Sequence, residues 1–203
     1  MEPIRSVRIV VTGGPGGGKT TAADLFRREI GDSVVVVPEA ASLLFAGGFP
    51  RYDEPLARRS GQCAIYHLQR NLEDVQAAHF QDRILLCDRG TVDGAAYWPD
   101  SPEGFFAAVG SSLEAELKRY DAVIFFETAA VGGHTIEGNP VRTESQDQAV
   151  SLDRKLHALW SHHPRFFFVP NNQSFFKKIT YGLAHLEGVV AQLRKSLAEG
   201  DGQ

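Results

Sequence analysis

The feature that most constrains this chain is a glycine-rich segment between an apolar run and an amphipathic run. Residues 13–20 read GGPGGGKT, a full match to the pattern G-x-x-x-x-G-K-[ST]. Glycines let consecutive backbone N–H groups point at one anion, while the lysine ammonium reaches phosphate oxygens. The β-branched run at residues 7–12 predicts a buried strand before the loop, and residues 18–30 predict a helix after it. This context predicts a phosphate-binding loop that leads into the positive end of a helix.

The loop defines the first set of candidate ligand-binding residues. We expect the loop amides and Lys19 to contact the phosphates, and the hydroxyl of Thr20 to ligate Mg²⁺. A flexible glycine turn is the structural alternative, but the flanking strand and helix favour phosphate binding. The predicted nucleotide-contacting set is Gly13, Gly14, Pro15, Gly16, Gly17, Gly18, Lys19, Thr20 and Thr21.

Composition and charge place the chain among soluble globular proteins. Its 203 residues, of which 43% are hydrophobic, suit one domain with a substantial core. A net charge of −4 gives no general attraction to nucleic acid or acidic membranes, and no apolar run approaches the roughly 20 residues of a membrane span. The first predicted strand lies close to the start and only two cysteines occur, so we expect no signal peptide, no disulfide framework and a cytoplasmic location.

Short apolar runs alternate with helical patterns along the whole chain. Strands are predicted at residues 7–12, 33–37, 83–87, 122–126 and 165–169. Helices are predicted at residues 18–30, 39–46, 54–80, 102–120, 144–162 and 174–198. Such alternation predicts an α/β fold, with a parallel sheet between helical layers, as a single nucleotide-binding domain over residues 1–203.

The least regular stretch is residues 129–143, which contains three glycines and a proline. Glycine hinges are typical of mobile lids, so we expect a lid there, with an ordinary surface loop as the alternative. Arg142 borders this stretch, and Arg154 lies on the next predicted helix. Either arginine can close over the transferred phosphate, and surface charge is the alternative for both. The position beside the loop favours Arg142.

Polar residues follow several predicted strands, where ligands bind in open α/β sheets. Asp88 ends an apolar run and is a candidate Mg²⁺ ligand together with Thr20. The next residue is Arg89, whereas many motor-type ATPases place a water-activating glutamate there. An arginine beside a transferring phosphate stabilises its charge, which favours a kinase-type site. A local cap or ion pair is the alternative for Asp88 and Arg89.

Glu39 follows the second predicted strand. A carboxylate at this position can accept the proton of an attacking hydroxyl. It can equally hold a magnesium-bound water or cap the helix that begins at Ala40. The long helix predicted at residues 54–80 carries two faces of different character. The core stripe that we predict consists of Leu56, Cys63, Ala64, Leu68, Leu72 and Val75. The other face, which either reads a second substrate or is solvated, carries Arg58, Gln62, Tyr66 and Gln69.

Several of these segments together resemble the P-loop kinase-type NTPase superfamily. They are residues 12–21, 36–41 (VVPEAA), 87–90 (CDRG) with Asp93, and 139–144 (NPVRTE). Within that superfamily the chain resembles an AAA-labelled ATP-binding family related to the kinase domain of NadR, the nicotinamide riboside kinase. The resemblance spans nearly the whole chain. It implies a three-layer P-loop NTPase fold with a parallel five-stranded sheet in the order 2-3-1-4-5.

The segments around Glu39 and Arg89 are also similar to those of deoxynucleoside and thymidylate kinases. In those enzymes the carboxylate after strand two contacts the acceptor hydroxyl, and the arginine after strand three contacts phosphate or sugar oxygens. The resemblance implies these roles for Glu39 and Arg89 in this chain.

Taken together, the residues and the resemblance predict an ATP- and Mg²⁺-dependent phosphotransferase. Its partners are then a nucleoside triphosphate and an unidentified small hydroxyl-bearing acceptor, of nucleoside or ribosyl type, with no nucleic acid and no membrane. The predicted catalytic set is Lys19, Glu39, Asp88, Arg89 and Arg142. One alternative is an ATP or GTP hydrolase or switch that acts on a protein partner, although no guanine-reading N-K-x-D string occurs. The other is a nucleotide-binding module without chemistry.

Overall fold

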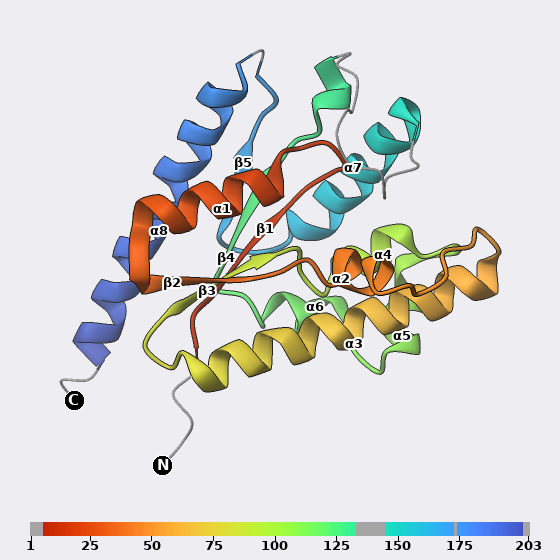
Figure 1. The fold of residues 1–203 in the computed structure, drawn as a ribbon, viewed down its shortest axis with the longest axis horizontal. Coiled ribbons are helices and arrows are strands. Elements are labelled where there is room, and N and C mark those ends of the chain that lie inside the picture. The colour runs from red at the N-terminus through yellow and green to blue at the C-terminus, as the bar shows by residue number, and fades with distance from the viewer. Residues whose placement is uncertain (1–5, 133–144, 173, 201–203) are drawn as a thin grey trace.

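A central parallel sheet organises the molecule. The computed structural model describes residues 6–132, 145–172 and 174–200. Its strands are β1 (Arg8–Thr12), β2 (Val34–Val37), β3 (Ile84–Asp88), β4 (Ala122–Phe126) and β5 (Phe166–Val169). All four strand pairings are parallel, and the order is β2-β3-β1-β4-β5 (Figure 1). The predicted fold class and strand order are therefore confirmed.

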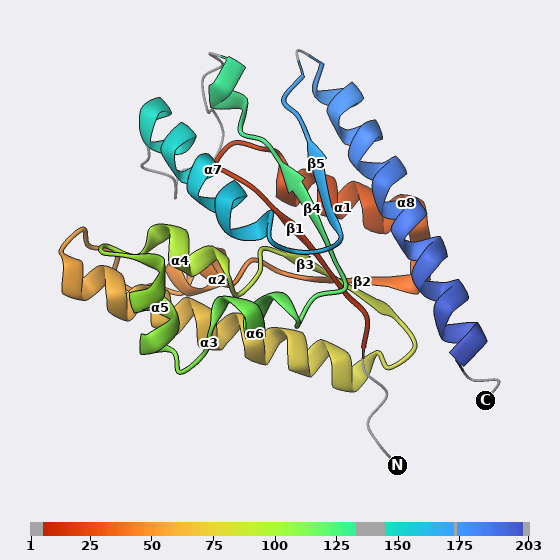
Figure 2. The same ribbon diagram turned by 180° about the vertical axis from the view of Figure 1, so that it is seen from behind.

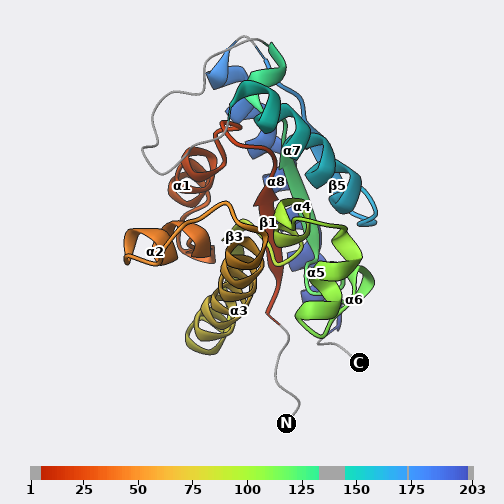
Figure 3. The same ribbon diagram turned by 90° about the vertical axis from the view of Figure 1, so that its right-hand side faces the viewer.

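Helices cover both faces of the sheet (Figure 3). In chain order they are α1 (Lys19–Ile30), α2 (Ala40–Ala46), α3 (Pro55–His79), α4 (Asp93–Tyr97), α5 (Pro102–Ala108), α6 (Leu113–Leu117), α7 (Gln146–Trp160) and α8 (Phe175–Gly200). Short 3-10 turns, η1 (Gly31–Ser33) and η2 (Ala129–Gly132), complete the described elements. Within the described ranges, every helix is too short or too polar to serve as a membrane-spanning segment.

Two hydrophobic cores lie on opposite faces of the sheet because strand side chains alternate. Ile9 and Val11 of β1 pack with Phe26 of α1 and Leu186 of α8. Val10 of β1 faces the other way. It packs in the second core with residues of α3, α5 and α7, among them Tyr66, Phe105 and Trp160. Figure 2 shows α4 between α7 and α3 on this second face. Tyr66 and Phe105 of this second core also line a cavity.

The prediction of one continuous helix at residues 102–120 is wrong. The chain forms α5 and α6 there, separated by a turn in which Gly110 has a φ of 66°. The side chain of Ser112 then begins α6 by accepting a hydrogen bond from Ala115 N at 3.1 Å. A left-handed glycine ends one helix and a serine cap starts the next, so the continuous helical pattern is interrupted.

The core stripe predicted for α3 is also wrong at both ends. Leu56 is 74% exposed and Val75 is 66% exposed. The buried face instead carries polar side chains that satisfy one another. Tyr66 donates to Glu116 at 2.7 Å, and Glu73 accepts from residues near the end of α6. Hydropathy could not identify this face because its partners lie about 50 residues away along the chain.

Candidate active site

The loop of residues 13–18 joins β1 to α1, and its curled shape requires glycine. Gly13 has a φ of 134° and Gly18 a φ of 84°, values that other residues rarely adopt. A Cβ on Gly13 would lie 2.0 Å from the carbonyl oxygen of Phe126, so close packing on β4 excludes a side chain. Within the loop, Gly17 N donates to Gly14 O at 3.3 Å. The backbone therefore has the compact form that presents amides to an anion.

Lys19 lies at the first position of α1 and is almost completely buried. It is 2% exposed, and its Nζ donates to Gly14 O at 2.6 Å. The ammonium is thus held against the loop. Thr20 and Thr21 follow on the exposed side of the first turn. Because backbone amides and an ammonium meet at one helix N-terminus, the arrangement suits binding of phosphate.

A buried carboxylate that sequence reasoning missed fixes α7 to the loop. Asp153 is 5% exposed, and its Oδ1 accepts from Gly14 N at 2.7 Å and from Thr128 N at 2.9 Å. Burial raises the pKa of Asp153, and the hydrogen bonds from the two N–H groups act against this rise. The one signal in the sequence is that Asp153 interrupts the apolar stripe formed by Ala149 and Leu156 of α7.

Thr20 and Asp88 form the candidate magnesium site. The Thr20 hydroxyl donates to Asp88 Oδ2 at 2.7 Å, and Asp88 is 3% exposed. Within the described residues, Oδ1 of Asp88 is buried without a hydrogen-bond partner. Burial, and next the negative charge of Glu39, raise the pKa of Asp88. An unsatisfied carboxylate oxygen beside a hydroxyl fits Mg²⁺, which prefers hard oxygen ligands and keeps several waters.

Arg89 lies at the centre of a buried ionic cluster. Its Nε donates to Glu39 Oε1 at 3.1 Å, and its NH1 donates to Asp93 Oδ2 at 3.1 Å. NH1 also donates to Gly13 O at 2.9 Å, which ties the guanidinium to the phosphate loop. Burial disfavours the charge, but nearby acidic groups, first Tyr97 in its ionised form at high pH and then the carboxylates of Glu39 and Asp93, hold the pKa of Arg89 well above its ordinary value. Arg89 is therefore positively charged at all physiological pH values.

The backbone of Arg89 is strained. Its φ of 79° lies in the left-handed region, which costs a residue other than glycine on the order of 1–3 kcal/mol. Two hydrogen bonds to the main chain of Arg89 hold it in this conformation. Arg89 N donates to Val11 O at 3.0 Å, and the side-chain Nε2 of Gln69 donates to Arg89 O at 3.3 Å. Strain that the surroundings hold in place is concentrated at functional sites.

Glu39 follows β2 and faces the cluster from the far side of β3. Its Oε2 accepts from Ser42 Oγ at 2.5 Å, and its side chain makes no capping hydrogen bond to α2. The capping alternative for Glu39 is therefore wrong. β3 lies between β2 and β1, and Arg89 bridges Glu39 to the phosphate loop by donating to both Glu39 and Gly13 O.

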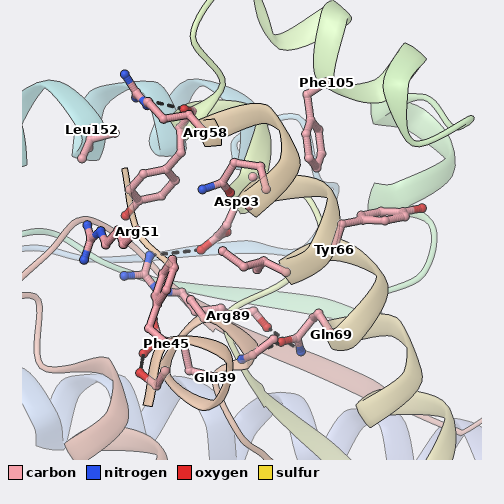
Figure 4. A pocket seen from close by; sticks show the side chains of 18 of the residues that line it. Glu39, Phe45, Arg51, Arg58, Tyr66, Gln69, Arg89, Asp93, Phe105 and Leu152 are labelled. Atoms are coloured by element: carbon pink, nitrogen blue, oxygen red, sulfur yellow. Dashed lines mark hydrogen bonds and ion pairs between the residues drawn. The ribbon is translucent and has the colours of Figure 1, made fainter. Parts of the chain in front are cut away.

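A cavity of about 440 Å³ opens between the phosphate loop, α2, α3 and α7 (Figure 4). Pro15 of the loop, Glu39 and Arg89 all line it. So do the residues predicted for the second face of α3, which are Arg58, Gln62, Tyr66 and Gln69. The remaining polar lining includes Arg51, Asp93 and Lys155, which sequence reasoning either missed or noted only within a motif. A volume of this size suits a small-molecule ligand.

Other predicted residues lie elsewhere. Arg142 and residues 133–143 of the predicted lid lie outside the described residues, while residues 129–132 form η2. Arg154 is on the exposed side of α7 and does not line the large cavity. A smaller cavity of about 170 Å³ lies beside the phosphate loop, and its lining includes Gly16, Gly17, Asn171, Asn172, Phe175 and Lys178.

Comparisons with known proteins agree with this geometry. A family model described as an AAA domain matches residues 8–177, and the chain belongs to this family. No curated protein matches the sequence significantly. Among solved structures, the chain is similar to the thymidylate kinase from Ehrlichia chaffeensis, with 14% identity, a TM-score of 0.62, and coverage of 92% of this chain and 98% of that chain. The family and the shared fold place the chain in the P-loop kinase-type NTPase superfamily.

Proposed function

We propose that this member of the AAA-domain family is an ATP- and Mg²⁺-dependent phosphotransferase whose acceptor is a small hydroxyl-bearing molecule of nucleoside or ribosyl type. The observation that carries the proposal is the cavity of about 440 Å³, which is bounded by the phosphate loop at Pro15 and by Glu39 and Arg89. A nucleotide hydrolase needs room only for water beside the γ-phosphate, whereas a kinase needs room for a second substrate.

In this proposal each residue of the candidate site has one role. The loop amides and Lys19 bind the phosphates, and Thr20 and Asp88 would hold Mg²⁺. Bound magnesium supplies neutralisation of the charge that develops on the phosphate oxygens. Arg89 stabilises the transferred group from the acceptor side. Arg142 stays a predicted contributor, and residues 1–203 stay a predicted single domain.

The reaction follows from the position of Glu39. The acceptor hydroxyl oxygen forms a bond to the γ-phosphorus while the bond from that phosphorus to the bridging β-oxygen breaks. The hydroxyl proton passes to the Glu39 carboxylate, and ADP leaves. Ser42 and Arg89 hold the two oxygens of that carboxylate at the edge of the cavity, so its orientation is defined before the acceptor binds.

Release of ADP from Mg·ATP, measured with and without a small-molecule extract, tests the proposal. We expect turnover that depends on the extract. Turnover that does not change with the extract would identify a hydrolase, and binding without turnover would identify a module without chemistry. The Lys19→Met variant is the control. It retains the buried volume of the side chain but not its ammonium, so it should lose both nucleotide binding and ADP release while its circular dichroism spectrum is unchanged.

A further inference from the structure

The cationic side chains that line the large cavity fall into two groups. Arg89 is paired with the carboxylates of Glu39 and Asp93, both at 3.1 Å. Arg51 lies over the ring of Phe45, 5.3 Å from its centroid. These two guanidinium groups are thus held by neighbouring side chains. The other two lining cations, Arg58 and Lys155, have no carboxylate partner among the described residues.

Arg58 and Lys155 come from different helices but line the same cavity. Arg58 of α3 donates from NH2 to the carbonyl oxygen of Tyr97 at 3.0 Å, which orients its guanidinium. In the part of the chain that the structure describes, the ammonium of Lys155 has neither an ion pair nor a hydrogen bond. Figure 4 labels Arg58 and Leu152 among the residues that line the cavity. Lys155 follows Leu152 by three residues on the same face of α7 and lines the same cavity. The two cations thus border one cavity from different helices.

The acids of the cavity do not balance these cations. Glu39 and Asp93 are both engaged by Arg89. Asp53, on the exposed loop before α3, is the other acid that lines the cavity. The side of the cavity between α3 and α7 thus carries excess positive charge, which attracts anions.

The rest of the lining combines apolar side chains with uncharged polar ones. Phe45, Phe105 and Leu152 contribute apolar surface around the cavity (Figure 4). Gln62 of α3 also lines it, and its amide makes no hydrogen bond to any described residue. Gly61 is buried, yet a Cβ added there would meet no atom within 4 Å, so it leaves open space on the cavity side. These features fit a ligand with a flat apolar body.

We propose that the acceptor carries an anionic group, a phosphate or a carboxylate, which Arg58 and Lys155 bind together. Its ring-bearing body lies against the apolar lining, with Gln62 reading a polar edge. The inference rests on the proposed function, because it assigns the large cavity to the acceptor. It distinguishes this acceptor from a neutral nucleoside, which offers no negative charge to two cations that lack a carboxylate partner among the described residues.

A binding measurement on the full chain tests the proposal without turnover. The protein is first saturated with Mg·ADP, so that the phosphate loop is filled. It is then titrated calorimetrically with phenyl phosphate, which joins a ring to an anion, and with benzyl alcohol, which has the ring alone. We expect phenyl phosphate to bind more tightly, and the difference to shrink as ionic strength rises.

Three substitutions locate the binding site of the anion. Arg58→Gln and Lys155→Gln should each weaken phenyl phosphate binding about tenfold, as for loss of one charge-assisted hydrogen bond, and leave benzyl alcohol binding unchanged. Arg154→Gln is the matched control, because Arg154 is adjacent to Lys155 but does not line the cavity. It should change neither affinity.

Three results would overturn the inference. They are equal binding of the two probes, a loss in Lys155→Gln no greater than in Arg154→Gln, and a loss of Mg·ADP affinity in Lys155→Gln with phenyl phosphate unaffected. The last result would assign Lys155 to the donor nucleotide. Because ADP release is not measured here, failure of this inference is distinguishable from failure of the kinase assignment.

Discussion

The phosphate loop and the large cavity lie side by side but are built in different ways. The loop is a contiguous segment of eight residues, and its functional groups are mostly backbone amides beside a buried lysine. The cavity is lined by residues from many separate segments, including α2, α3, α4, α5 and α7, spread between residues 15 and 155. The shape of the phosphate loop is therefore determined mainly by one short segment of the sequence. The cavity forms only when the helices on the second face of the sheet have packed together.

Two glycines make the contrast measurable. Gly13 of the phosphate loop has a left-handed φ and lies against the backbone of β4. Gly61 of α3 has helical neighbours and open space where its side chain would be. The first glycine is required by packing, while the second preserves room for a ligand.

The largest effect is expected for Gly13→Ala. The added Cβ would lie 2.0 Å from Phe126 O in a strained backbone conformation, so the free energy of unfolding should fall by on the order of 4 kcal/mol. Gly61→Ala should instead raise it by about 0.5–1 kcal/mol, because alanine is the better helix former. Urea denaturation of both variants checks this pair. Equal effects of the two substitutions would remove the contrast between the regions.

Lys178, beside the phosphate loop, predicts a pH dependence. It is 4% exposed, it donates to Glu127 O at 2.5 Å, and burial lowers the pKa of Lys178 from 10.5 to about 8. Below pH 8 the charged form carries a cost in the folded state. Between pH 8 and 10.5 the unfolded chain binds more protons, so stability rises relative to a Lys178→Met variant by up to about 3 kcal/mol.

Urea denaturation of the wild-type chain and Lys178→Met at pH 7, 8, 9 and 10 measures that difference. The comparison cancels the titration of groups common to both proteins. A difference that stays constant over this pH range would show that Lys178 is not destabilised by burial.

A smaller effect, confined to the acceptor side, is expected for Gly61→Leu. The leucine side chain occupies space that the proposed acceptor would fill, so the KM for the acceptor should rise about thirtyfold, which corresponds to about 2 kcal/mol. Affinity for Mg·ATP should not change. Loss of both affinities would show that the cavity and the phosphate loop are not separate subsites.

Asp88→Asn should give the smallest effect, on the order of tenfold in the Mg²⁺ concentration needed for ATP binding. The amide preserves shape but removes the charge that a hard cation prefers. ATP titrations with Mg²⁺ and with EDTA check this. If the two titrations shift equally, Asp88 is structural and the metal assignment fails.

The donor side could be predicted well from the sequence because its signals are local. The runs that form the strands are short and apolar on both faces. The pattern G-x-x-x-x-G-K-[ST] directly identifies the residues that are expected to contact phosphate. Glu39, Asp88 and Arg89 were found because they lie at or just after the carboxyl ends of strands, which meet at one edge of the sheet.

The contacts that join distant segments were only partly predictable. Asp153 of α7 accepts from Gly14 of the phosphate loop across 139 residues, and no periodic pattern encodes that distance. Lys155 of α7 lines the cavity, whereas the adjacent Arg154 does not. Neighbouring residues of a helix point in different directions, and the sequence alone does not show which of the two faces the cavity. The buried polar face of α3 could not be predicted for the same reason. Its Tyr66 donates a hydrogen bond to Glu116 of α6, which lies 50 residues away in the sequence.

The most direct test of the central claim is transfer of radiolabelled γ-phosphate from ATP to a small molecule by the wild-type chain and by Glu39→Gln. The amide keeps the size of the carboxylate but cannot take a proton, so transfer should fall about 10²–10⁴-fold while the dissociation constant for Mg·ATP is unchanged. Transfer by Glu39→Gln at a near-normal rate, or release of all label as inorganic phosphate by the wild-type chain, would contradict the account.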